Sequence, residues 1–214
     1  MKINLKTANK VTQIYAEAGV IEKLGELAAE LVKGRRAAIV SDSNVAPHYL
    51  EHIKEILAQS GFTTGAGIVV PAGEASKQPD KLIELWEEFN KLGITRKDVI
   101  IALGGGVVGD LAGFAAATYL RGCPIIQVPT SLLAMVDSSV GGKTAINLKA
   151  GKNLCGAFYQ PIAVYADCET LNTLPEETFN EGCAEIIKYG MILDGEFLTY
   201  LSENSIRENI EYVI

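Results

Sequence analysis

The chain has 214 residues, of which 48% are hydrophobic, and its formal net charge is −7. This composition is typical of a globular protein with one generous core, or with one domain and the start of another. Interspersed charges leave no broad basic face for nucleic acid, and no stretch approaches the ~18 uninterrupted apolar residues of a membrane span. Four cysteines without CxxC spacing favour buried thiols in a reducing cytoplasm: Cys123, Cys155, Cys168 and Cys183.

Short runs rich in β-branched residues alternate with segments of helical period, which predicts a layered α/β domain with a parallel sheet. We expect an extended piece at 12–15 and strands at 37–41, 67–70, 99–103, 125–128 and 163–165. Helices are expected at 21–32, 47–60, 79–92 and 110–119. After Pro175 only helical periods follow, so residues 1–175 should form the α/β domain and 176–214 the beginning of a helical one. The final ENIEYVI pattern lacks a stop signal, and we expect a truncation there.

A glycine cluster follows the predicted strand at 99–103. Gly104, Gly105, Gly106 and Gly109 precede a helix rich in small residues, and the letters satisfy GxGxxG. Glycines let the backbone approach a pyrophosphate, while free amides and the helix dipole attract its charge. Such a turn can also be a plain strand-to-helix connection. Strand, turn and helix together favour dinucleotide or phosphate binding.

The residue that would hold the ribose of a dinucleotide is less clear from the pattern. The next predicted strand ends in Val128, Pro129 and Thr130, where an acidic residue is usual. Asp42 and Asn44 are candidates at a neighbouring strand end, although they fit equally well as a helix cap. Asp110 likewise has two possible roles: it could contact the cofactor, or its negative charge could simply favour the start of a helix.

The segment 130–153 is too polar and glycine-rich for a core element and too apolar for a solvated linker. Its charged and amide residues could line a cleft for a ligand with phosphate and carboxylate groups, or form a surface loop with solvated lysines. A P-loop is excluded, because Asp137 stands where the Walker pattern needs a glycine before Gly142, Lys143 and Thr144.

Glu181, Glu185 and Lys188 follow helical spacing, which makes Glu185 and Lys188 neighbours on one face. Apolar residues around them argue against full exposure. The pair is either a metal ligand with a substrate anchor or a surface ion pair.

In this order, the segments GGGVVGDLAGFAAATYLRG, VPTSLLAMVDSSVGGKTAINL, GKN and EGCAEIIKYG resemble 3-dehydroquinate synthases, within the sugar-phosphate cyclase group. The resemblance runs from about Asp42 to Asp194. It implies a Rossmann-like NAD-binding domain followed by the start of an α-helical domain, in a cytoplasmic enzyme that is a homodimer when intact. That enzyme of the shikimate pathway would convert 3-deoxy-arabino-heptulosonate 7-phosphate to 3-dehydroquinate and phosphate, with NAD and a divalent metal, zinc or cobalt.

The resemblance also implies a set of site residues. NAD contacts would fall on Asp42, Asn44, Glu74, Lys77, Gly105, Gly106, Val107, Val108, Gly109, Asp110, Thr130, Ser131, Leu133, Ser138, Lys143, Lys152, Thr170 and Thr173. Substrate contacts would fall on Arg121, Asp137, Lys143, Lys152, Asn153 and Lys188. Glu185 is similar to the family's single carboxylate ligand of the metal, whose other ligands are histidines of a second domain. His48 and His52 lie on an early helix, so the metal site should be incomplete in this chain.

Two alternatives stay open. A metal-dependent polyol or alcohol dehydrogenase would share the glycine loop, but its substrate has no phosphate for the lysines to hold. A non-catalytic nucleotide-binding fragment would bind NAD and do no chemistry.

Overall fold

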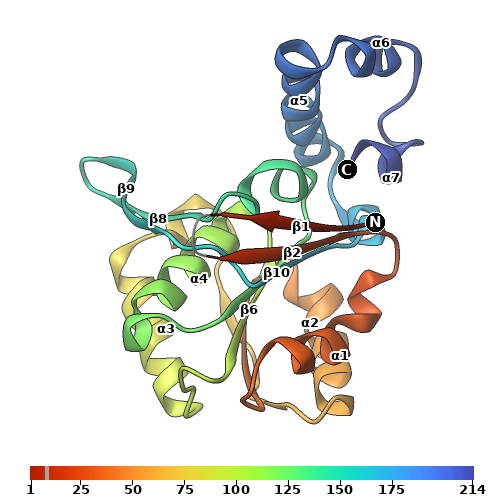
Figure 1. The fold of residues 1–214 in the computed structure, drawn as a ribbon. Coiled ribbons are helices and arrows are strands. Elements are labelled where there is room, and N and C mark those ends of the chain that lie inside the picture. The colour runs from red at the N-terminus through yellow and green to blue at the C-terminus, as the bar shows by residue number, and fades with distance from the viewer. Residues whose placement is uncertain (8–9) are drawn as a thin grey trace.

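A computed structural model describes residues 1–7 and 10–214, and it confirms the α/β class (Figure 1). One mostly parallel sheet runs in the order β1, β2, β10, β7, β6, β3, with β4 and β5 both paired to β3. β1 is antiparallel to β2, and the other pairings in this sheet are parallel. The strands are β1 (Lys2–Lys6), β2 (Val11–Ala16), β3 (Arg36–Asp42), β4 (Thr63–Thr64), β5 (Ile68–Val70), β6 (Val99–Gly104), β7 (Ile125–Pro129) and β10 (Ala163–Ala166).

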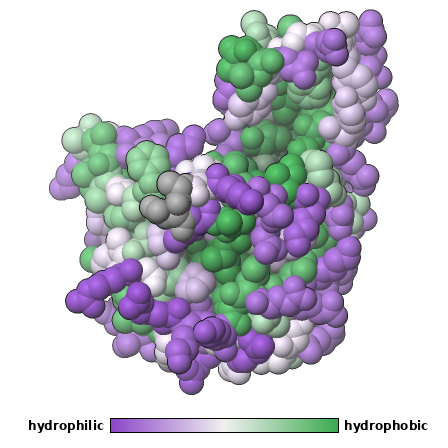
Figure 2. Space-filling view, viewed as in Figure 1, coloured by the Kyte–Doolittle hydropathy of each residue, from purple (hydrophilic) through white to green (hydrophobic). Residues whose placement is uncertain are grey.

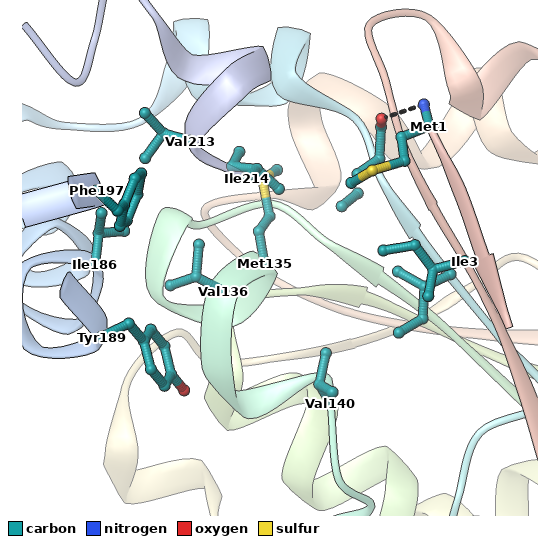
Figure 3. A pocket seen from close by; sticks show the side chains of 13 residues that line it. Met1, Ile3, Met135, Val136, Val140, Ile186, Tyr189, Phe197, Val213 and Ile214 are labelled. Carbon is teal, nitrogen blue, oxygen red and sulfur yellow. Dashed lines mark hydrogen bonds between the residues drawn. The ribbon is translucent and has the colours of Figure 1, made fainter. Parts of the chain in front are cut away.

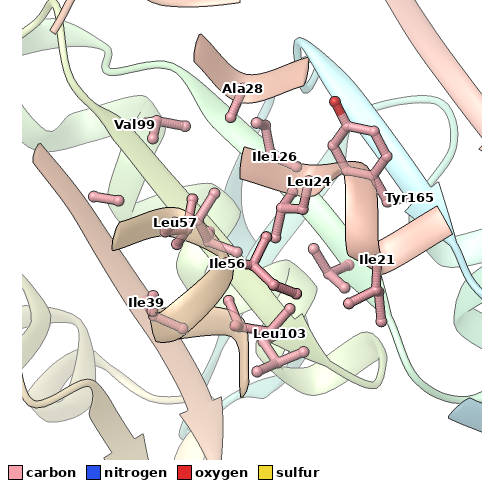
Figure 4. Close-up of a cluster of buried hydrophobic side chains, with 14 of the residues drawn as sticks. Ile21, Leu24, Ala28, Ile39, Ile56, Leu57, Val99, Leu103, Ile126 and Tyr165 are labelled. Carbon is pink, nitrogen blue, oxygen red and sulfur yellow. The ribbon is translucent and has the colours of Figure 1, made fainter. Parts of the chain in front are cut away.

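Helices cover both faces of this sheet because successive side chains of a strand point to opposite sides. Ile39 and Ile101 pack under α1 (Leu24–Leu31) and α2 (Ala46–Gln59), as Figure 4 shows for Ile39. Ala38 and Ile100 pack under α3 (Pro79–Lys91) and α4 (Gly106–Thr118). β6 is buried along its whole length, which places it at the centre of both layers.

Most element boundaries agree with the sequence prediction, but α4 begins at Gly106 rather than at residue 110. The glycine turn therefore leads straight into the helix. β1 and β4 were not predicted from the sequence. The polar segment 130–153 also differs from the expectation of a non-core stretch, because it contains one turn of helix at Ala134–Ser138 and the strand β8 (Lys143–Leu148).

β8 forms an antiparallel hairpin with β9 (Gly151–Phe158) that projects beside α4 (Figure 1). Thr144 and Ile146 are buried against α4, whose Gly113 leaves room for them. A Cβ on Gly113 would overlap the methyl group of Thr144. The hairpin thus depends on the small-residue surface of α4.

Helices follow Pro175, as the periodicity indicates: α5 (Glu176–Leu193), α6 (Gly195–Glu203) and α7 (Ile210–Val213). Phe179 and Ile186 of α5 pack with Leu132 and Met135, so this region rests on the segment after β7. Within residues 1–7 and 10–214, no helix has the length and apolarity needed to cross a lipid bilayer.

The four cysteines are free thiols, of which Cys123 and Cys168 are buried and the other two are half-buried. Burial raises the pKa of the Cys123 thiol to about 11. At neutral pH it is therefore an unreactive core side chain.

Candidate functional site

Several polar segments meet at the edge of the sheet where the parallel strands end. β3, β6 and β7 are neighbours, so their carboxyl ends lie side by side, which is where open α/β sheets bind ligands. The amide of Thr130 donates to the carbonyl of Gly104 at 3.0 Å and ties two of these ends together. Thr130 and Ser131 are buried there, and Leu133 is half-buried.

The glycine turn forms a backbone cradle at this edge. α4 starts at Gly106, and the amides of a first helical turn have no partner inside the helix. A Cβ on Gly106 would lie 3.0 Å from the hydroxyl of Ser138, and one on Gly105 would lie 3.3 Å from that of Ser131. The Ser138 hydroxyl is buried and has no hydrogen-bond partner among the described residues. An anionic group in the cradle would satisfy both the amides and this hydroxyl, so the residues fit a dinucleotide phosphate.

The other residues of the turn have packing roles. Val108 is fully buried, and its side chain lies over Gly104. Gly109 lets α4 approach β7, because a Cβ there would lie 2.9 Å from the Gln127 side chain, which also donates to the Gly109 carbonyl at 3.2 Å. Any ligand contact of Val108 or Gly109 must therefore involve backbone atoms, whereas Val107 is only partly buried.

A buried lysine and two carboxylates flank the cradle. The Lys77 ammonium, whose side chain is 5% exposed, lies 2.6 Å from the Asp110 carboxylate and 3.8 Å from that of Glu74. Burial raises the pKa of the Asp110 carboxyl above its usual value, and the hydrogen bond from Lys77 offsets only part of that shift. Asp110 thus does more than favour the helix start, since it holds a buried cation beside the glycine turn.

Asp42 caps a turn in the structure. Its carboxylate accepts hydrogen bonds from the amides of Asn44, at 2.8 Å, and Val45, at 3.1 Å, just before α2. Val45 is the N-cap of α2 and that helix has no side-chain cap, so Asp42 closes the turn before the helix instead of capping the helix as the sequence alternative had it. Thr170 and Thr173 lie in a 3-10 helix at Cys168–Thr173, where the Tyr49 hydroxyl lies 2.6 Å from that of Thr173. Contacts of these residues with a cofactor remain predictions.

A cleft of about 500 Å³ opens beside the cradle, under the β8–β9 hairpin. Five of the sequence-predicted residues line it: Asp110, Asp137, Ser138, Lys143 and Asn153. The Lys143 ammonium is 3.7 Å from the Asp137 carboxylate, and the Tyr189 hydroxyl donates to the same carboxylate at 3.2 Å. A cation, a carboxylate and an amide side chain therefore face one space next to the glycine turn.

Lys152 and Arg121 are placed differently. Lys152 is exposed near the tip of the hairpin, one residue before Asn153. Arg121 follows α4 at the end opposite the glycine turn and is not among the residues that line the cleft. This chain alone does not bring Arg121 to the other predicted substrate contacts.

Glu185 and Lys188 form an ion pair on α5, with side chains 30% and 44% exposed. The hydrogen bond with Glu185 raises the pKa of the Lys188 ammonium. Lys188 also lies 4.5 Å from the ring centroid of Tyr189, the residue that contacts Asp137. α5 thus contacts Asp137, a residue of the cleft, through Tyr189.

The described residues do not fit a metal site by themselves. Within 1–7 and 10–214 there is no group of three or more His, Cys, Asp or Glu placed to hold an ion. His52 lies 2.6 Å from Glu22, and His48 sits one turn earlier on α2. Both histidines therefore lie on α2 and not beside Glu185. Among the described residues, Glu185 has no further metal ligand next to it.

An apolar hollow of about 310 Å³ separates the α5–α7 region from the sheet (Figure 3). Its lining includes Ile3, Met135, Ile186, Phe197 and Ile214. The surface between the helices and the sheet is also largely hydrophobic in Figure 2. Its lining is mostly apolar, unlike that of the polar cleft under the hairpin.

The sequence reasoning missed Gln127, Tyr189 and Asn147 as parts of the site. Asn147 lies near the end of the motif VPTSLLAMVDSSVGGKTAINL. Its polar side chain directly after the buried Ile146 was the one feature of the sequence that could have marked it as a site residue. Two of its partners, Glu74 and Lys77, belong to a segment remote in the chain, which spacing along the sequence does not reveal.

Comparison with known proteins agrees with this geometry. Residues 67–181 match the family model described as 3-dehydroquinate synthase N-terminal. The 3-dehydroquinate synthase of Symbiobacterium thermophilum is 53% identical over 189 residues, which are 88% of this chain and 52% of that protein. The chain therefore spans about half the length of the curated relatives it matches.

Two solved structures share the fold closely. A 2-deoxy-scyllo-inosose synthase in complex with carbaglucose-6-phosphate, NAD+ and Co2+ has a TM-score of 0.83 at 30% identity, over 90% of this chain and 52% of that one. The 2-epi-5-epi-valiolone synthase of Streptomyces hygroscopicus subsp. jinggangensis 5008, with NAD+ and Zn2+ bound, has a TM-score of 0.81 at 27% identity, over 93% and 54%. Because the family model covers more than half of the residues, the chain belongs to the 3-dehydroquinate synthase family.

Proposed function

We propose that this chain is the NAD-binding part of an enzyme that converts 3-deoxy-arabino-heptulosonate 7-phosphate to 3-dehydroquinate and phosphate. The observation that carries the proposal is the glycine cradle directly beside a cleft that presents Lys143 and Asn153, together with a buried Ser138 hydroxyl that has no partner within residues 1–7 and 10–214. NAD in the cradle supplies reversible hydride removal from a secondary alcohol, which acidifies the neighbouring carbon-hydrogen bond.

The residues of the cleft have distinct parts in this proposal. Lys143 and Lys188 bind the phosphate and neutralise its charge as it leaves by elimination, and the phosphate itself takes the proton from the adjacent carbon. Asn153 and Lys152 hold the sugar acid from the hairpin. Asp137, which Tyr189 and Lys143 orient, accepts a hydrogen bond from a substrate hydroxyl. Ring opening and an intramolecular aldol closure of the sugar acid would then complete the product.

The metal enters the proposal only through Glu185, as one ligand of zinc or cobalt. Since the described residues supply no others, no step is assigned to a metal here. We also propose that residues 176–214 belong to a second, helical domain, and that the intact enzyme is a cytoplasmic homodimer.

The test uses the purified chain with NAD, substrate and zinc. Calorimetry should detect NAD binding, and we expect neither phosphate release nor dehydroquinate formation, because the chain holds one metal ligand. Accumulation of NADH would favour the polyol or alcohol dehydrogenase, and dehydroquinate formation would refute inactivity of the chain alone. Absence of NAD binding would refute the proposal itself.

A further inference from the structure

Asn147 touches both sides of the proposed site. Its backbone amide donates to the carbonyl of Lys77 at 2.7 Å, and its side-chain amide donates to the Glu74 carboxylate at 2.7 Å. Its side-chain oxygen accepts from the amide of Asn153 at 2.8 Å. One residue therefore joins the segment beside the cradle to the tip of the hairpin.

The local backbone explains how Asn147 can do this. Between the pairs Ile146–Cys155 and Leu148–Gly151, β8 has only Asn147 whereas β9 has residues 152–154, so the extra residues of this irregularity lie on β9 and include Asn153. A bulge frees a residue from the ladder and re-aims its side chain, and bulges are common next to active sites. Asn147 stands opposite these extra residues, and its backbone amide points to Lys77 instead of to β9.

Asn153 is held in a sparsely populated conformation. Its φ of 56° lies in the left-handed region, which few residues other than glycine and asparagine adopt. The hydrogen bond from its amide to Asn147 supports that conformation and fixes where Asn153 stands at the cleft.

We propose that Asn147 is a positioning residue that links nucleotide binding to the order of the hairpin tip. The proposal rests on NAD binding beside Glu74 and Lys77. NAD that fixes the Glu74–Lys77 segment also fixes Asn147, and through it Asn153 and its neighbour Lys152. By reciprocity, an anion held by the tip strengthens NAD binding by the same factor. The hairpin is then poised for the sugar phosphate only when the cofactor is in place.

Amide hydrogen exchange by NMR, with and without saturating NAD, tests this link in the chain itself. In the wild type, NAD should slow exchange of the Asn153 amide by about tenfold, since opening of the tip then also costs the contacts at Glu74. In Asn147→Ala, NAD should still protect the amides of the glycine turn but leave Asn153 unchanged. The dissociation constant for NAD should rise about fivefold, because a carboxylate loses one hydrogen bond.

Two further variants control for general damage. Leu148→Ala changes the next residue, whose side chain is exposed, and should keep the NAD response of Asn153. Asn147→Asp keeps the shape and the acceptor for Asn153 but sets a like charge against Glu74, so the response should vanish with the fold intact. This variant decides the matter if Asn147→Ala does not fold.

The outcomes are separable from those of the proposed function. Equal protection of Asn153 by NAD in the wild type and in the Asn147 variants would overturn the link while leaving NAD binding in place. Failure of the wild type to bind NAD at all would overturn both.

Discussion

Asp98, at the edge where the parallel strands begin, and Asp110, at the edge where they end, are both withdrawn from solvent, but their partners differ. Asp98 is 3% exposed and accepts three hydrogen bonds, from the Arg36 amide and from the amide and hydroxyl of Thr95. Asp110 has one partner, the Lys77 ammonium. Burial raises the pKa of both carboxyls; at Asp98 the hydrogen bonds outweigh it and lower the pKa, whereas at Asp110 burial prevails.

The difference suits two roles: Asp98 stabilises the fold, and Asp110 lies where we propose that a ligand binds. The bonds of Asp98 join the starts of β3 and β6, and they leave the carboxylate satisfied. Around Asp110 the polar groups are under-satisfied: one cation serves two carboxylates, and the Ser138 hydroxyl nearby has no partner among the described residues. Buried polar groups without partners are costly, and a ligand bound beside the glycine turn would supply the bond that the Ser138 hydroxyl lacks among the described residues. Ser41, Trp86, Gln160 and Tyr165 also carry buried polar atoms without a partner there, so it is the position of Ser138 next to the glycine turn that links it to a ligand.

The largest expected effect is that of Lys77→Met, which tests how far the ligand edge depends on its buried lysine. Asp110 would be left buried without a counter-charge, and we expect the free energy of unfolding to fall by about 3 kcal/mol. Urea denaturation measures this, and calorimetry should show weaker NAD binding. Lys91→Met is the matched control, since Lys91 is exposed and pairs with Glu88 at the surface. A variant as stable as the wild type would contradict the importance of the Lys77–Asp110 pair.

Asp98→Asn probes the opposite edge, and its effect should depend on pH. The folded pKa lies below the ordinary 3.8, so the carboxylate contributes stability above that value, and the contribution is lost as the pH falls through the folded pKa. At neutral pH we expect a loss of about 2 kcal/mol in the free energy of unfolding, because charge-assisted bonds become neutral ones. Denaturation curves of both proteins should converge in acid. A gap that stayed constant down to the lowest pH would exclude the charge as its cause.

Much of this organisation could be predicted from the sequence, where local signals were strong. The runs of β-branched residues located β3, β6 and β7, and the glycines after β6 located the cradle. The hairpin was not predicted, because its residues mix lysine, asparagine and glycine, and its burial depends on the remote Gly113. Asp137, Lys143 and Asn153 of the cleft were candidates from the polarity of segment 130–153, and the family resemblance implied the same residues. Spacing along the chain could not show that Asp42 caps a turn or that Arg121 stands at the far end of α4, since both facts follow from the three-dimensional path.

Gly106→Ala should separate ligand binding from stability at the cradle. Gly106 is not in the left-handed region, and alanine favours helix, so the melting temperature should change little. The new Cβ would occupy the space 3.0 Å from Ser138, and NAD affinity should fall roughly tenfold. Gly195→Ala is the control, because a Cβ there meets nothing within 4 Å. Unchanged NAD affinity would place the cofactor elsewhere.

The smallest effect on stability is expected for Lys188→Ala, which extends the comparison to the helical region. The Lys188–Glu185 pair is largely open to solvent, and exposed ion pairs contribute little because water and salt screen them. Thermal melting should therefore be the same as that of the wild type. Binding of inorganic phosphate in the presence of NAD should weaken nonetheless, because a cation is lost beside the Asp137 and Tyr189 contact. A fall in melting temperature as large as that of Lys77→Met would show instead that the Lys188–Glu185 pair supports the fold. In that case the burial of a charged side chain would not distinguish the charges that stabilise the fold from those that bind a ligand.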